Sequence, residues 1–325
     1  MLRRLTENIL EKRKQRYSAR QKSFSFYQLL MKSQRFIPFK RYSIIAKLMA
    51  SPHLKSTIFP VEGRKWIISP YASSTWAPFG LKEPHIFFHL KTLLQNADGF
   101  IDCGANLGWY SLLASRYNRI KSIIAIEPVS QSVRYLKIIK QLNQIENLTI
   151  VKGCISDHDG IVLFSLPEQR FSEMGCVETL TMNGDNSRFL LESPSYTLQS
   201  IVDKIPTSLN HICMKVDIEG HERTVLNSVT RETLAKRFQS AVVEVHLYKF
   251  SKPEEELEEI CQILSVIGEP QFLLSPQFSP SYARFLYHRF KYYPISKLKL
   301  GSILDLIRRS KISELHVLVE RKPLC

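Results

Sequence analysis

A glycine-rich turn between a strand-like run and a helix constrains this chain more than any other feature. The apolar run at residues 100–103 carries Asp102 near its end and leads into Gly104-Ala105-Asn106-Leu107-Gly108. Glycine lets the backbone approach a ligand closely, and the free amides of the helix that follows point into the same space. The pattern predicts a nucleotide-like ligand at the end of a β-strand.

The next apolar run narrows the choice of ligand. Residues 122–126 lead into Glu127, which lies 19 residues after Gly108, where a carboxylate can accept both hydroxyls of a ribose. The turn has the spacing Gly-x-Asn-x-Gly, not the Gly-x-Gly-x-x-Gly that places a pyrophosphate on a helix. The sequence therefore favours an adenosine without a diphosphate and argues against NAD.

Two later apolar runs also end in polar side chains. Residues 211–216 precede Asp217 and Glu219, and residues 240–245 precede His246. Ligands of open parallel sheets bind beyond the carboxyl ends of the strands. We therefore expect one crevice to collect Asp102, Glu127, Asp217, Glu244 and His246.

In these segments the chain resembles the FkbM-type S-adenosylmethionine-dependent methyltransferases. The resemblance covers residues 98–250, with the motifs in the family's order and spacing; Cys103, Cys154 and His221 depart from its usual small or aliphatic residues. It implies a class I methyltransferase fold, S-adenosyl-L-methionine as cofactor, and O-methylation of a sugar, a glycan or a secondary metabolite. The matching motifs are residues 100–108, 125–128, 148–160, 196–200, 215–222 and 243–246.

Apolar runs alternate with helical stretches along the chain, which predicts βαβ units and an α/β fold. We expect a Rossmann-like, mostly parallel sheet with helices on both faces. Residues 66–325 would form the methyltransferase domain, with its core at 98–250 and closing elements at 251–325. Residues 167–194 are expected to form a long loop over the acceptor site. Expected strands are 99–103, 122–127, 148–151, 160–166, 211–217, 241–246 and 315–321, and expected helices are 83–96, 107–117, 130–142, 222–234 and 253–266.

The basic residues are concentrated at the N-terminus. Residues 1–65 hold 16 Lys and Arg against three Glu, a net charge of +13, whereas the rest of the chain holds 29 against 27. We expect a basic, helical extension that contacts an anionic membrane or an acidic partner, or remains a solvated cap. Nucleic acid is a less expected partner.

The cysteines and the apolar segments bear on the location of the protein. The six cysteines contain no Cys-x-x-Cys pair, which suits a reducing cytosol, and no apolar run approaches the length of a transmembrane helix. The predicted location is therefore the cytoplasm, with the basic extension able to bring the protein to the inner membrane surface.

The resemblance suggests a role for each candidate. The acceptor hydroxyl would attack the methyl carbon in line with the departing sulfur, so the protein must fix the angle, exclude water and remove a proton. Asp102 would orient the amino acid end of the cofactor, Glu127 would hold its ribose, and Asp157 would receive the adenine amino group. The other cofactor-binding candidates are Gly104, Asn106 and Gly108.

His246 is the preferred general base, because an imidazole with a pKa near ~6.5 is neutral at cellular pH. Asp217 is its competitor, as base or as the residue that positions the acceptor. Glu219 is the third catalytic candidate, although it and Glu222 also suit the first turn of a helix. A divalent metal held by Asp217, Glu244 and His246 is a further option, but their spacing matches no recognised pattern and we expect no metal.

Two other classes of function stay open. The chain could be an inactive methyltransferase-fold scaffold, held at a membrane or a glycan-assembly complex by its basic N-terminus. It could also be a nicotinamide-dependent oxidoreductase, which the missing pyrophosphate fingerprint disfavours. Binding of S-adenosylmethionine separates the enzyme from both.

Overall fold

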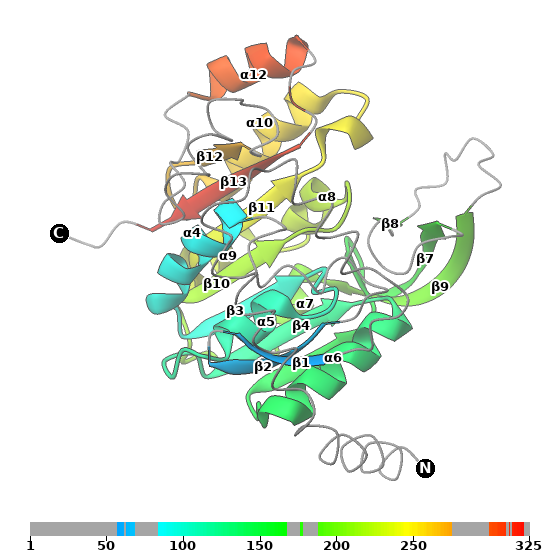
Figure 1. Cartoon of the computed structure of the whole chain (residues 1–325). Coiled ribbons are helices and arrows are strands. Elements are labelled where there is room, and N and C mark those ends of the chain that lie inside the picture. The colour runs from blue at the N-terminus through cyan, green and yellow to red at the C-terminus, as the bar shows by residue number, and fades with distance from the viewer. Residues whose placement is uncertain are drawn as a thin grey trace, which may run out of the picture.

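The computed structural model describes residues 57–61, 63–68, 84–167, 176–177, 188–274, 299–309, 312 and 314–321. Its centre is a seven-stranded sheet in the order β12-β13-β11-β10-β3-β4-β5 (Figure 1). Neighbouring strands from β11 to β5 are parallel, and β13 runs antiparallel between β11 and β12. The strands are β3 (Gly99–Cys103), β4 (Ser122–Glu127), β5 (Leu148–Lys152), β10 (Ile212–Val216), β11 (Phe238–Val245), β12 (Gln271–Leu274) and β13 (Leu315–Glu320).

Helices cover both faces of this sheet, as predicted. Successive residues of β3 face opposite layers: Phe100 packs with the first group of helices, and Ile101 and Cys103 pack with the second. Because both faces are buried, the strands read as continuous apolar runs rather than alternating ones. The first group is α4 (Pro84–Gln95), α5 (Trp109–Ala114) and α6 (Ser130–Asn143), and the second is α7 (Leu198–Val202), α8 (Glu222–Asn227), α9 (Arg231–Arg237), α10 (Pro253–Leu264) and α12 (Leu300–Arg308).

A short hairpin precedes the first helix of the sheet layers. Strands β1 (Thr57–Val61) and β2 (Arg64–Ile68) pair antiparallel, and the buried ring of Trp66 lies edge-on to Trp109 at 5.6 Å and to Tyr135 at 5.5 Å. The expected helix is therefore wrong for residues 57–61 and 63–65, while residues 1–56 and 62 lie outside the described residues. The predicted boundary at residue 65 falls within β2; the division into an extension and a domain stays a prediction.

A smaller sheet projects beside the carboxyl ends of the parallel strands (Figure 1). Its order is β6-β9-β7-β8, and β7 pairs antiparallel with β9 along its whole length. Residues 188–194 are thus strand, not the predicted loop, because pairing with β7 supplies backbone partners that local composition does not reveal. Residues 167 and 176–177 of the expected loop are also strand, and its residues 168–175 and 178–187 lie outside the described residues. The strands are β6 (Cys154–Ser156), β7 (Gly160–Pro167), β8 (Cys176–Val177) and β9 (Arg188–Thr197).

One helical segment differs from the prediction. The single helix expected at residues 222–234 is two helices, because Thr230 caps a new one by accepting a hydrogen bond from the Thr233 amide at 3.0 Å.

Among the helices that the structure describes, none has the length and apolar character needed to cross a bilayer.

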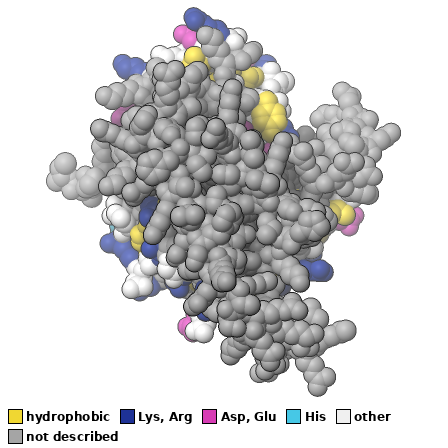
Figure 2. Space-filling model, in the orientation of Figure 1, with side chains coloured by type: hydrophobic (Ala, Val, Ile, Leu, Met, Phe, Trp, Pro, Cys, Tyr) yellow, Lys and Arg dark blue, Asp and Glu magenta, His cyan; other side chains and the backbone are white. Residues whose placement is uncertain are grey.

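Described basic side chains are visible at several places on one face of the molecule (Figure 2). On the face in Figure 2, the described Lys and Arg side chains are scattered around the outline of the molecule and do not gather into one patch. This agrees with the nearly balanced charge of the chain after residue 65.

The hairpin packing predicts a stability effect. Trp66→Ala should lower the free energy of unfolding by about 3–5 kcal/mol, because it leaves a cavity between the rings of Trp109 and Tyr135. Urea denaturation followed by circular dichroism measures the change. Lys65→Ala is the matched control: its side chain is exposed and should change stability by no more than about 0.5 kcal/mol. Equal effects of the two substitutions would contradict the docking of this hairpin.

Candidate active site

The turn after β3 is left-handed at three positions. Gly104, Asn106 and Gly108 have φ values of 75°, 48° and 84°. A Cβ atom on Gly104 would lie 1.9 Å from the carbonyl oxygen of Asp217, and one on Gly108 would lie 2.1 Å from Leu136 Cδ2. The glycines therefore let parts of the same chain approach the turn. The approach of a ligand to Gly104 and Gly108 stays a prediction.

Glu127 ties the end of β4 to this turn. One of its carboxylate oxygens accepts a hydrogen bond from the Asn106 amide at 2.8 Å, and the other accepts one from the Val129 amide at 2.8 Å. Burial raises its pKa to about 7, although these two hydrogen bonds oppose the shift. Each oxygen keeps a second lone pair, which can accept a hydrogen bond from a ribose hydroxyl.

Asp102 lies on the α5 side of the sheet and is 1% exposed. Its Oδ2 accepts a hydrogen bond from Ser111 Oγ at 2.6 Å, whereas its Oδ1 is buried without a hydrogen-bond partner among the described residues. Asn106 Oδ1 and Trp109 Nε1 are also buried without a hydrogen-bond partner among the described residues. Burial raises the pKa of Asp102, and the charge of Lys215 opposes that shift. The turn thus offers three buried polar atoms to a ligand.

The turn after β10 packs directly against the turn after β3. The amide of Asp217 donates a hydrogen bond to the Cys103 carbonyl at 3.1 Å. Lys215, which pairs with Asp102 in the register of β10 and β3, donates to Asp217 Oδ2 at 2.8 Å and lies 4.9 Å from the centre of the Tyr110 ring. A buried lysine therefore joins the first turn to the second.

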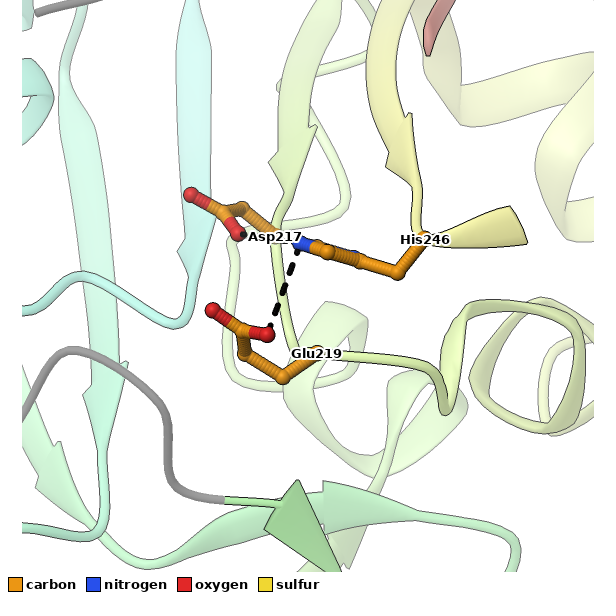
Figure 3. Close-up of side chains that lie close together, drawn as sticks. All are labelled: Asp217, Glu219 and His246. Carbon is orange, nitrogen blue, oxygen red and sulfur yellow. Dashed lines mark ion pairs between the residues drawn. The ribbon is translucent and has the colours of Figure 1, made fainter. Parts of the chain in front are cut away.

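His246 follows β11 and lies among four carboxylates. Its Nδ1 is 2.8 Å from Glu222 Oε1, and its side chain points toward those of Asp217 and Glu219 (Figure 3). Its Nε2 lies 3.7 Å from Glu219 Oε2, 3.9 Å from Asp217 Oδ1 and 4.0 Å from Glu244 Oε1. We call Asp217, Glu219 and His246 the acidic–imidazole cluster.

The backbone brings Glu219 back toward His246. Glu219 has a φ of 58°, a strained conformation for a residue with a side chain, and Gly220 follows with a φ of 99°. The Gly220 amide donates to Glu222 Oε1 at 2.9 Å, and the hydroxyl of Tyr248 in the short 3₁₀ helix η3 (Leu247–Lys249) donates to Glu219 Oε2 at 3.2 Å. Burial raises the pKa of Glu219, and the charge of His246 opposes that shift.

The charges around His246 change its expected chemistry. Burial alone would lower its pKa, but the hydrogen bond to Glu222 and the charges of Glu222, Asp217 and Glu244 outweigh burial and raise the pKa to about 10. The premise that His246 is neutral at cellular pH is therefore wrong for this arrangement. In the cluster as it stands, Asp217 and Glu219 are the groups able to receive a proton.

The remaining predicted residues lie nearby but differ in setting. Glu244 is turned toward β13, with His316 Nε2 3.2 Å from its Oε2. Asp157 is largely exposed, and its Oδ1 is 2.7 Å from His158 Nδ1 and accepts a hydrogen bond from Ser156 at 3.1 Å. Its contact with an adenine stays a prediction.

Sequence reasoning missed the roles of two charged residues. Lys215 is a lone charge inside a buried apolar run, and this pattern signals a partner in the interior. Glu222 is fully buried, whereas its position in a first helical turn suggested only a favourable contact with the helix dipole. Its function as the partner of His246 depends on a contact across 24 residues that no local pattern displays.

A comparison with protein families identifies the family of this chain. The model of the methyltransferase FkbM domain matches residues 102–271, more than half of the chain. The protein belongs to the FkbM methyltransferase family. Its cofactor is S-adenosylmethionine. No curated protein matches the chain in sequence.

Solved structures with a similar fold are distant in sequence. A SAM-dependent methyltransferase from Agrobacterium tumefaciens is 9% identical, with a TM-score of 0.39, over 84% of this chain and 72% of that one. A precorrin-6y C5,15-methyltransferase from Geobacter metallireducens is 10% identical, with a TM-score of 0.35, over 72% and 86%. An rRNA methylase from Streptococcus thermophilus is 10% identical, with a TM-score of 0.36, over 74% and 98%. These scores support no inference about the acceptor.

The residues present fit the cofactor. Asp102 Oδ1 and Asn106 Oδ1 are buried acceptors without partners among the described residues, and an amino group is the kind of donor that would satisfy them. Glu127, at the end of the neighbouring strand, retains acceptor capacity for the ribose. These atoms therefore fit a cofactor at this edge of the sheet, and the role of each residue stays a prediction.

The contact between the two turns predicts different effects of two Gly→Ala substitutions. Gly104→Ala should lower the free energy of unfolding by about 2–5 kcal/mol, because left-handed strain adds to a collision with the Asp217 carbonyl. Gly63→Ala is the matched control, since Gly63 has a φ of 76° but nothing lies within 4 Å of its Cβ position. We expect it to cost only the strain, about 1–2 kcal/mol. Similar losses in urea denaturation would refute the close packing of the turns.

Proposed function

We propose that this protein is an O-methyltransferase that acts on a hydroxyl group of a sugar, a glycan or a secondary metabolite. The observation that carries the proposal is the position of the acidic–imidazole cluster beside the cofactor turn. The Asp217 backbone contacts Cys103 and Gly104, and its side chain faces His246. A hydroxyl must lose its proton as it is methylated, and this cluster supplies proton acceptors next to the donor site.

When bound, S-adenosylmethionine supplies an activated methyl group on a positively charged sulfur. In our proposal Asp102 and Asn106 hold the amino acid end, Glu127 holds the ribose, and the cluster receives the acceptor proton. The buried surroundings of Asp102 and Glu127 exclude water from the donor side and fix both carboxylates in place. Orientation of the two reactants is then the main contribution of the protein.

The contacts of the protein in the cell form part of the same proposal. We propose a cytoplasmic enzyme whose basic residues 1–65 contact an anionic membrane surface or an acidic partner. The net charge of +13 in that segment supports this, whereas the chain beyond it is nearly neutral. An acceptor built into a lipid-linked glycan would suit such a location.

The acceptor class can be tested directly. Purified protein is incubated with methyl-labelled S-adenosylmethionine and a cell lysate separated into lipid, glycan, protein, RNA and small-molecule fractions. We expect label in glycans or small hydroxylated metabolites, and methylation analysis should identify a methyl ether. Label in RNA or polypeptide would overturn the proposed acceptor while leaving the methyltransferase family intact.

The raised pKa of Glu127 predicts a pH-dependent affinity for the cofactor. Ribose hydroxyls donate to the ionised carboxylate, so binding favours the form that prevails above pH 7. The Kd measured by calorimetry should increase by about tenfold from pH 8 to pH 6, with release of a proton on binding near pH 7.

Two variants isolate this effect from the titration of the cofactor itself. Glu127→Gln should bind more weakly and lose most of the pH dependence. Glu146→Gln, a change at an exposed position, should retain the wild-type profile. An unchanged profile in Glu127→Gln would remove Glu127 from the ribose site.

A further inference from the structure

The three side chains of the acidic–imidazole cluster are arranged as ligands of one ion. One ligand atom from each of Asp217, Glu219 and His246 lies within 4.8 Å of the other two. His246 Nε2 is 3.7 Å from Glu219 Oε2 and 3.9 Å from Asp217 Oδ1, too far for hydrogen bonds. Atoms that share a metal ion lie about 3–4 Å apart, because each is about 2.0–2.2 Å from it. Figure 3 shows that the three side chains converge from the β10–α8 turn and the end of β11.

The second observation is the state of the His246 ring. The residue is 4% exposed; its Nδ1 is held by Glu222, and no hydrogen bond is formed by its Nε2 within the described structure. This nitrogen is aimed at the carboxylates of Asp217 and Glu219 (Figure 3). A carboxylate on the far ring nitrogen is the usual support of a metal-bound histidine, because it fixes the tautomer and the ring orientation.

The local balance of charge also favours a cation. Four carboxylates have an oxygen within 4.0 Å of the His246 ring nitrogens. Lys215 pairs with Asp217 at 2.8 Å, the charge of Lys249 acts on Glu219, and His316 faces Glu244 from the opposite side. Carboxylates held this close repel one another in a buried setting, and a dication at the shared point would relieve that repulsion.

We propose that Asp217, Glu219 and His246 bind a divalent metal ion of the Mn²⁺ or Mg²⁺ class, with Glu222 as the positioning residue of His246. Two carboxylate oxygens and one imidazole nitrogen suit such ions, and the ion displaces the proton that the His246 imidazolium carries in its absence. The ligand set differs from the one weighed on sequence grounds: Glu219 takes the place of Glu244, which faces His316. Sequence spacing predicted no metal, and only the folded arrangement of the turn brings Glu219 to the site.

The consequence of this site rests on the proposed function. An acceptor hydroxyl on the ion would lie next to the cofactor turn, because Asp217 contacts both. The ion would make that hydroxyl more acidic, and its proton would leave for solvent or a nearby carboxylate as oxygen bonds to the methyl carbon. Asp217 and Glu219 would then hold the cation rather than receive the proton.

Metal binding is measured on the full chain after removal of metals with EDTA and exchange into chelator-free buffer. Titration calorimetry with Mn²⁺ should show one site. Glu219→Gln and His246→Gln should each weaken Mn²⁺ binding at least tenfold, and Glu222→Gln should weaken it by about 10–100-fold. Glu232→Gln is the matched control, since that carboxylate is 73% exposed and its ion pair among the described residues is with Lys236; it should leave binding unchanged.

Pulsed EPR of bound Mn²⁺ gives a readout that does not depend on activity. A nitrogen modulation is expected in the wild-type protein and should disappear in His246→Gln. Circular dichroism shows whether each variant is folded. If His246→Gln does not fold, Glu219→Gln is the variant that decides the test. Absence of Mn²⁺ binding, or binding equally tight in Glu219→Gln, would overturn the site and leave the imidazolium of His246 as the only cation of the cluster.

The outcomes separate this inference from the proposed function. Methyl transfer to a hydroxyl that persists in EDTA, together with no Mn²⁺ binding, overturns the metal site and leaves the O-methyltransferase standing. Mn²⁺ binding that depends on Glu219 and His246, together with label found only outside hydroxyl acceptors, supports the site and overturns the proposed acceptor.

Discussion

The contact between the turn after β3 and the turn after β10 is the constraint on which the site depends. The Asp217 carbonyl occupies the space that a side chain on Gly104 would fill, and the Asp217 amide binds the Cys103 carbonyl. One short contact therefore sets the distance between the turn after β3 and the acidic–imidazole cluster. Lys215 stabilises this contact, because its ammonium group donates a hydrogen bond to Asp217 and its charge acts on the buried carboxylate of Asp102.

Much of the fold could be predicted because its strands are buried on both faces. The strands at 99–103 and 122–127 have the predicted bounds, since each is a continuous apolar run that ends at a turn residue. The prediction failed where pairing is long-range. Residues 188–194 become strand through β7, and β12 joins the sheet only through β13, so no local pattern marks either. The hairpin at 57–68 was hidden by the basic composition around it.

The candidate site was predictable as a set of residues but not as a set of protonation states. Polar residues at strand ends indicated that Asp102, Glu127 and Asp217 lie near one another, and the charges of Asp102 and Asp217 do act on Glu127, while their functional roles stay a prediction. The chemistry of His246 could not be predicted, because its pKa depends on Glu222 and Glu244, whose directions only the fold defines. The left-handed backbone at Glu219, which no sequence pattern displays, places this catalytic candidate beside the imidazole.

The place of β13 in the sheet has a consequence for biosynthesis. β13 is inserted between β11 and β12, although more than 60 residues separate it from the end of β11. Until β13 has been synthesised and has left the ribosome, β11 has one unpaired edge and β12 lacks its neighbour in the sheet. Such an edge invites association between nascent chains, so we expect chaperone availability to govern the yield of soluble protein.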